Sequence, residues 1–143
     1  MARTIADPVY DRTKPLPAIT PLYHHQLVNV PGFSHIALEV RFPPGGASPP
    51  HRHGGASVSG LVVSGTGYNK MNDGPTTVLE RGGAWYEAPG CHHKVSMNAS
   101  EIEEYVIVAS FVVESRVVEE GGYAALVVVD PEYADVKMTP EAK

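Results

Sequence analysis

Two segments, GGASPPHRHGG at residues 45–55 and GGAWYEAPGCHHKVSMN at residues 82–98, decide the fold of this chain. His51 and His53 are two positions apart, so their side chains point to the same face of an extended strand, in which successive side chains alternate. The two imidazoles can therefore bind one metal ion together. A third imidazole from a neighbouring strand, for which His93 is the candidate, would complete a three-nitrogen set with positions open for substrate, water or oxygen.

The spacing within these segments resembles the motifs of the cupin family, G(X)5HXH(X)3-4E(X)6G and G(X)5PXG(X)2H(X)3N. The chain matches them at Gly45, His51, His53, Gly65, Gly82, Gly90, His93 and Asn98. It departs from them at three places. Val58 or Ser57 stands where the first motif has Glu, and Ala88 stands where the second has Pro. One extra residue separates His93 from Asn98. The resemblance implies an all-β fold, the double-stranded β-helix or jelly-roll barrel of the cupins.

The composition is typical of such a fold. The chain has 143 residues, enough for one domain with its own core, and its 13 prolines and 14 glycines favour short strands joined by turns over helices. The net charge of −5 argues against a nucleic acid or an anionic membrane as partner. A single cysteine excludes an internal disulfide, and we expect a cytoplasmic protein because no leader or long apolar run is present.

We expect three parts in the chain. Residues 1–22 contain four prolines and are predicted to form an extended arm, either loosely held or packed across a second subunit. Residues 23–130 are predicted to form a single barrel domain, and residues 131–143 a polar tail. The predicted strands are 25–30, 34–42, 57–64, 68–71, 76–80, 84–87, 102–114 and 124–129. The strand at 102–114 is apolar on both faces, which favours a homodimer.

His51, His53 and His93 are the predicted ligands of one divalent metal ion per chain, iron in the first place, with manganese, nickel or zinc as alternatives. The other interpretation is a cupin that has lost its metal. Without the motif Glu, three neutral imidazoles leave the divalent charge to be matched by the ligand, which favours an anionic, chelating molecule. Such a site is similar to those of cupin iron enzymes that cleave diketones or oxidise thiols.

Other side chains have two interpretations each. His92 is a candidate proton donor or acceptor at the pocket mouth, or else a surface or outer residue. Glu39 is a candidate catalytic carboxylate if its strand turns that face inward, and otherwise lies in solvent. Glu87 is expected in solvent, the alternative being that it orients a ligating imidazole. The candidate pocket walls are Tyr68, Met71, Trp85, Tyr86, Tyr105 and Phe111.

The sequence therefore predicts a metal-dependent enzyme acting on a small, oxygen-rich organic molecule, in the first place a non-haem oxygenase. A redox-neutral lyase, isomerase or decarboxylase that uses the metal as a Lewis acid is the second hypothesis. A non-catalytic, ligand-binding cupin is the third. The resemblance to cupins raises the expectation of oxygen chemistry by analogy alone.

Overall fold

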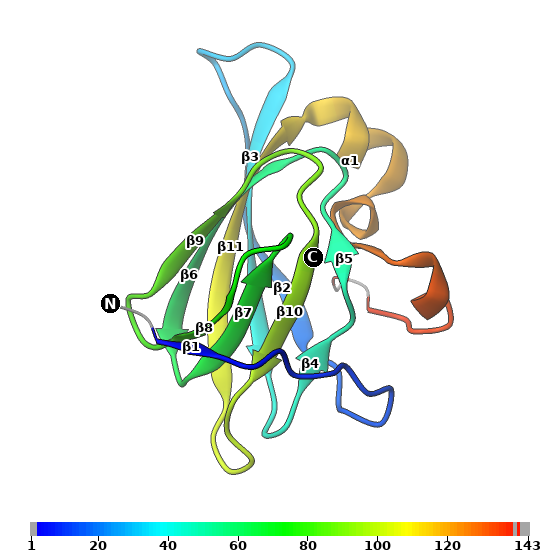
Figure 1. Ribbon diagram of the computed structural model, residues 1–143. Coiled ribbons are helices and arrows are strands. Elements are labelled where there is room, and N and C mark those ends of the chain that lie inside the picture. Colours follow the sequence, from blue (N-terminus) through cyan, green and yellow to red (C-terminus); the bar gives the residue numbers. More distant parts are fainter. Residues whose placement is uncertain (1–2, 139, 141–143) are drawn as a thin grey trace.

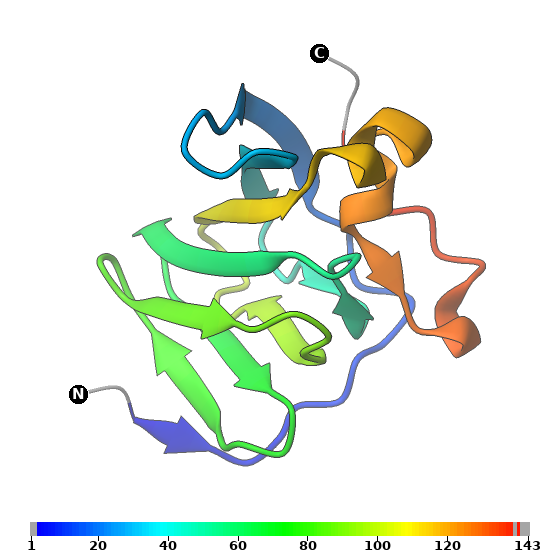
Figure 2. The same ribbon diagram turned by 90° about the horizontal axis from the view of Figure 1, so that it is seen from above.

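The computed structural model describes residues 3–138 and 140 and contains two antiparallel sheets that face each other (Figures 1 and 2). The seven-stranded sheet consists of β1 (Thr4–Ile5), β8 (Thr76–Leu79), β7 (Gly67–Met71), β10 (His93–Asn98), β5 (His51–Arg52) and β12 (Val128–Val129) in this order, with β4 (Ala47–Ser48) also paired to β10. The five-stranded sheet consists of β2 (Ala18–Gln26), β3 (Phe33–Phe42), β11 (Tyr105–Glu114), β6 (Ser57–Ser64) and β9 (Ala84–Glu87). The predicted all-β fold is thereby confirmed.

The alternation of side chains explains where the core lies. Strands β3 and β11 pair along their whole ten-residue length, with Leu38 opposite Ala109 and Ile36 opposite Phe111. Directly opposite residues point to the same face, and these four side chains belong to one buried cluster between the sheets. The predicted strand at 25–30 is wrong after Gln26, where β2 ends, and a loop with Pro31 and Gly32 leads into β3. The burial of Ile36 and Leu38 places the apolar face of β3 inside the barrel.

The N-terminal arm lies on its own barrel. Asp7 accepts hydrogen bonds from Lys70 and Thr76, and Ala47 N donates to Pro15 O over 3.0 Å. Tyr10 packs on a small cluster of Ala47, Val95 and Met97 on the outer face of the seven-stranded sheet. These contacts bind the arm to the subunit from which it starts. Its first two residues, like residues 139 and 141–143 of the predicted tail, lie outside the described residues.

The chain after β11 differs from the prediction. A short helix α1 (Ser115–Gly121) and a 3₁₀ turn η1 (Tyr123–Leu126) lead to β12, and a second 3₁₀ turn η2 (Pro131–Tyr133) follows. The predicted strand at 124–129 is therefore wrong over residues 124–127, and only Val128 and Val129 form a strand. The chain has to cross from the five-stranded to the seven-stranded sheet here, and Leu126, fully buried in the core, anchors the crossing. No helix among residues 3–138 and 140 is long and apolar enough to cross a membrane.

The outer face of the five-stranded sheet carries exposed apolar side chains from adjacent strands, including Leu61 on β6 and Val112 on β11. This is the face for which the sequence predicted a second subunit. The homodimer stays a prediction, and a mass of twice 15.3 kDa per particle in light scattering would support it, whereas a monomer mass would contradict it.

Candidate metal centre

Three imidazoles meet between the two sheets, at one end of the seven-stranded sheet. His51 on β5 and His93 on β10 are directly opposite each other in the strand register, and His53 follows one residue after the end of β5. The ring centroids of His51 lie 4.8 Å from His53 and 5.0 Å from His93. One nitrogen of each ring lies within 4.8 Å of the other two. The predicted cluster is therefore assembled in the folded chain, and its residues fit a metal ion.

The remaining nitrogen of each ring contacts an oxygen acceptor. His51 Nδ1 lies 2.7 Å from Pro49 O, and His53 Nδ1 lies 2.8 Å from Leu126 O. His93 Nε2 lies 2.7 Å from Asn69 Oδ1. Because these oxygens only accept, each of these nitrogens carries the proton, so the opposite nitrogen keeps its lone pair. Metal-binding histidines are typically oriented in this way, and the cluster thus has the tautomers that a metal requires.

The extra residue between His93 and Asn98 is absorbed by a bulge. In the pairing of β10 with β7, His93 lies opposite Met71 and Val95 opposite Lys70, so the register shifts between them. A bulge places two residues opposite one and re-aims the side chains beside it. His93 therefore faces the pocket while Asn98 still reaches its buried position, where its Nδ2 donates to Pro43 O and Glu103 O.

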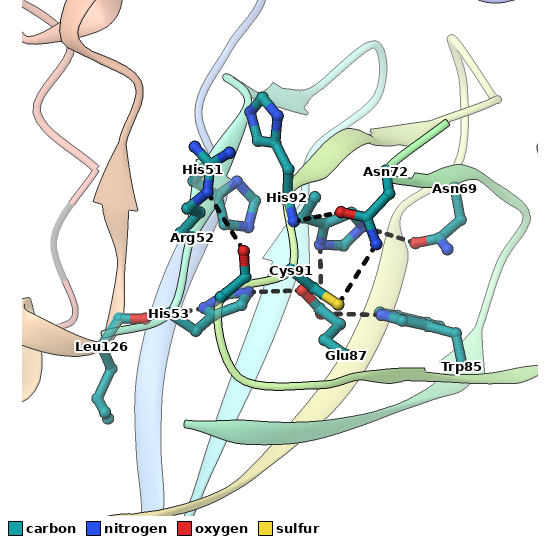
Figure 3. Close-up of polar contacts among 12 residues, drawn as sticks. His51, Arg52, His53, Asn69, Asn72, Trp85, Glu87, Cys91, His92 and Leu126 are labelled. Atoms are coloured by element: carbon teal, nitrogen blue, oxygen red, sulfur yellow. Dashed lines mark hydrogen bonds and ion pairs between the residues drawn. The ribbon is translucent and has the colours of Figure 1, made fainter. Parts of the chain in front are cut away.

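Glu87 lies in the site, which corrects the expectation of a solvent-exposed carboxylate. Its side chain is 3% exposed, with Oε1 3.2 Å from His53 Nε2 and Oε2 3.4 Å from His93 Nδ1. Trp85 Nε1 donates a hydrogen bond of 3.0 Å to Oε2, and Figure 3 shows the carboxylate between the Trp85 and His53 side chains. Trp85 and Glu87 are two positions apart on β9 and so share the inner face. That spacing places Glu87 on the same face as the predicted wall Trp85, but it does not indicate the contacts of Glu87 with the imidazoles.

Burial governs the protonation of the site. Burial, followed by the nearby His53 and His93 rings, holds the pKa of His51 well below its usual range. Burial also lowers the pKa of His93 to about 4, although Glu87 acts in the opposite direction. For Glu87, burial raises the pKa, but His93, His53 and the Trp85 N–H outweigh burial and lower it to about 2. At neutral pH His51 and His93 are therefore neutral, and Glu87 is a carboxylate anion.

The lowered pKa of His93 predicts a pH-dependent stability of the metal-free protein. The unfolded chain takes up a proton on His93 below pH 6.5, whereas the folded chain does so only near pH 4. The free energy of unfolding therefore decreases as the pH is lowered from 6.5 to 4. Between pH 7.5 and pH 5, His93 should lower the free energy of unfolding by about 2 kcal/mol. Urea unfolding at both pH values measures the loss, and His93→Gln should remove this part of it. An equal loss in His93→Gln would contradict the assignment.

The pocket beside the cluster is small and mainly apolar, with a cavity volume of about 30 Å³. Its walls are Ile19, Leu38, Val40, Phe42, Ser48, His51, His53, Trp85, Glu87, His93, Ser96, Ile107, Ala109, Phe111, Val127 and Met138. Two predicted walls, Trp85 and Phe111, are among them. The C-terminal segment contributes Val127 and Met138, which sequence reasoning missed because no motif marks that segment. A cavity of this size holds water-sized molecules, so a larger ligand would have to displace one of the walls.

The other predicted walls lie elsewhere. Tyr105 is buried against Phe42 in a separate part of the core, and Tyr68 packs against the cluster covered by the arm. Met71 lies opposite His93 in the sheet but is absent from the pocket walls. Tyr86 points outward and is 60% exposed, and its hydroxyl forms a hydrogen bond with the Ser57 hydroxyl.

The two predicted catalytic residues do not line the pocket. Glu39 alternates with the pocket walls Leu38 and Val40 on β3 and contacts Arg41 over 3.3 Å, so it faces away from the cluster. Of the two positions that the sequence allowed for Glu39, the structure has the one outside the pocket. His92 Nε2 lies 2.9 Å from both carboxylate oxygens of Asp130, which fastens the C-terminal segment to the second motif. His92 thus contacts Asp130 and is not one of the pocket walls.

Comparisons with known proteins agree with this geometry. A family model described as "Cupin domain" matches residues 38–109, half of the chain. No curated protein matches the chain. The solved structure of a conserved protein with a double-stranded β-helix domain from Klebsiella pneumoniae is similar to this chain, with a TM-score of 0.57 and 18% identity. The match covers 75% of this chain and 84% of the Klebsiella chain.

Two further solved structures are similar. A cupin domain from Bordetella pertussis has a TM-score of 0.52 and 23% identity over 72% of this chain and 99% of its own. An oxalate oxidase has a TM-score of 0.54 and 21% identity, over 78% of this chain and 52% of its own. At these identities the likeness shows the fold. The family match spans both motifs and all three clustered histidines, and the chain therefore belongs to the cupin family.

Proposed function

We propose that this cupin is a metal-dependent oxygenase acting on a small organic molecule. The observation that carries the proposal is the convergence of three imidazoles, each oriented by an oxygen acceptor, on a small pocket with mainly apolar walls. Nitrogen ligands with open positions suit iron and related divalent ions. When bound, such an ion would supply the electron transfer between an organic substrate and O₂ that an oxygenase needs.

The chain's own residues have distinct parts in this proposal. His51, His53 and His93 would hold the ion, and their backbone and Asn69 partners keep the rings in place. The apolar walls, for example Phe111 and Ile107, would exclude water and hold the apolar part of the substrate. The cavity of about 30 Å³ limits the substrate to a small molecule unless Met138 moves aside.

The redox-neutral alternative needs a group that moves a proton to or from the substrate. Glu87 is the carboxylate among the pocket walls, but its Oε2 accepts a hydrogen bond from Trp85, and its pKa, lowered to about 2, makes it a weak base. His92 and Glu39, the sequence-predicted candidates, contact Asp130 and Arg41 instead. The oxygenase therefore has the stronger structural support.

Oxygen consumption tests the proposal. The protein is loaded without air with Fe²⁺, Mn²⁺, Ni²⁺ or Zn²⁺ and mixed with a panel of small carboxylates, β-dicarbonyls and thiols in an oxygen electrode cell. We expect substrate-dependent O₂ uptake with the Fe²⁺ form and none with the Zn²⁺ form or with His93→Ala. Substrate conversion by the Zn²⁺ or Ni²⁺ form without O₂ uptake would contradict the oxygenase and identify the redox-neutral enzyme.

A further inference from the structure

We propose that Glu87 is a fourth metal ligand, supplied by β9 in place of the carboxylate that the first cupin motif places at Val58 or Ser57. This inference rests on the metal site of the proposed function. Sequence reasoning treated the motif Glu as lost, whereas the fold provides a carboxylate from a different strand at the same place.

The strand register brings the two positions together. Val58 on β6 lies directly opposite Glu87 on β9 in the antiparallel pair. Directly opposite residues have Cβ atoms about 4.5–5.5 Å apart and point to the same face of the sheet. Both residues are buried, with 1% of the surface of Val58 and 2% of the surface of Glu87 exposed. A carboxylate at position 87 can therefore reach the space that one at position 58 would reach.

The distances to the imidazoles suit two ligands of one ion. Glu87 Oε1 lies 3.2 Å from His53 Nε2, and Oε2 lies 3.4 Å from His93 Nδ1. Two ligand atoms bound to the same ion at roughly 2.1 Å, with an angle between a right angle and the tetrahedral value, stand about 3.0–3.4 Å apart. Each of these imidazole nitrogens is the one opposite the ring's bonded N–H.

The described residues leave this carboxylate incompletely satisfied. Glu87 Oε1 and His53 Nε2 are buried, and neither has a hydrogen-bond partner among the described residues, although they lie 3.2 Å apart. The pocket walls, within residues 3–138 and 140, include neither a lysine nor an arginine. A buried carboxylate without a cation is costly, as is a buried polar atom without a partner. A metal ion between Glu87 and the imidazoles removes both costs.

The fourth ligand changes the expected substrate. Three neutral imidazoles would leave two positive charges for the substrate to match, but a bound carboxylate cancels one of them. The site then suits a neutral or singly charged molecule better than a dianion. The apolar walls of the pocket agree with this preference.

Cobalt binding tests the proposal without any activity assay. Co²⁺ affinity is measured by chelator competition, and the visible absorption of bound Co²⁺ reports on its ligands. The variants are Glu87→Gln, Glu87→Val, the double variant Val58→Glu with Glu87→Val, and Glu80→Gln as the control for loss of one exposed carboxylate. Thermal unfolding of each metal-free variant shows whether it is folded.

We expect Glu87→Gln and Glu87→Val to weaken Co²⁺ binding by more than about 100-fold, beyond the usual effect of residues that only orient ligands. Their Co²⁺ spectrum should also change. The double variant should recover binding to within about tenfold of the unaltered protein, since its carboxylate comes from the opposite position of the same strand pair. An unchanged Co²⁺ spectrum in Glu87→Gln would overturn the proposal. Failure of the unaltered protein to bind Co²⁺ would instead remove the metal site itself, and with it the proposed function.

Discussion

Replacing His93 with alanine should weaken metal binding by more than about 100-fold, beyond the usual effect of residues that only orient ligands, while the barrel stays folded. The substitution removes one of three imidazoles and also the partner of Asn69. The fold survives because the core between the sheets is built from apolar side chains such as Ile36, Leu38 and Phe111. Metal content after loading and gel filtration, together with circular dichroism, measures both effects.

The matched control for this substitution is His25→Ala. His25 is an exposed histidine of β2 and is not one of the pocket walls, so its loss should leave the metal content unchanged. A folded His93→Ala protein that retains one ion per chain would show that the metal binds elsewhere. Loss of metal in both variants would indicate binding by exposed histidines.

Of the substitutions considered for stability, Gly65→Ala should have the largest effect, a loss of about 2–5 kcal/mol in the free energy of unfolding. Gly65 closes the first motif with φ at +81°, a left-handed conformation that disfavours side chains. An added Cβ would also lie 2.2 Å from Glu104 O and 2.9 Å from Tyr105 Cα, which are backbone atoms at the start of β11. The clash therefore cannot be relieved by a side-chain movement alone.

Gly82→Ala separates the two causes of this loss, the backbone strain at positive φ and the steric clash of the added Cβ. Gly82 opens the second motif and has nearly the same φ, +84°, but nothing lies within 4 Å of an added Cβ. Its substitution should cost only the backbone strain of about 1–2 kcal/mol. Urea unfolding of the two variants gives the comparison. Equal losses would mean that the approach of β11 to Gly65 contributes nothing.

Much of the site could be predicted because it depends on short-range spacing. His51 and His53 share one face through strand alternation, and the motif glycines fix the turns beside them. His93 required the family resemblance, since its position opposite His51 results from the pairing of β5 with β10. The bulge that absorbs the extra residue before Asn98 could not be read from local sequence.

Glu87 and the C-terminal walls could not be predicted for a different reason. The role of Glu87 depends on the register of β9 against β6, which sets it opposite Val58. Leu126 and Met138 reach the site from a segment whose path is decided by packing in the finished barrel. Alternation also left open which face of β3 looks inward, and only the packing of Leu38 and Ile36 in the core places Glu39 outside.

The metal-to-chain ratio of the purified protein tests the central claim most directly. The protein is loaded separately with Fe²⁺, Mn²⁺, Co²⁺, Ni²⁺ and Zn²⁺, passed over a desalting column and measured by elemental analysis. A site of three oriented imidazoles with Glu87 beside them predicts about one ion per chain for at least one of these metals. Ratios near zero for every ion would contradict the metal centre and leave a cupin that binds its ligand without a metal.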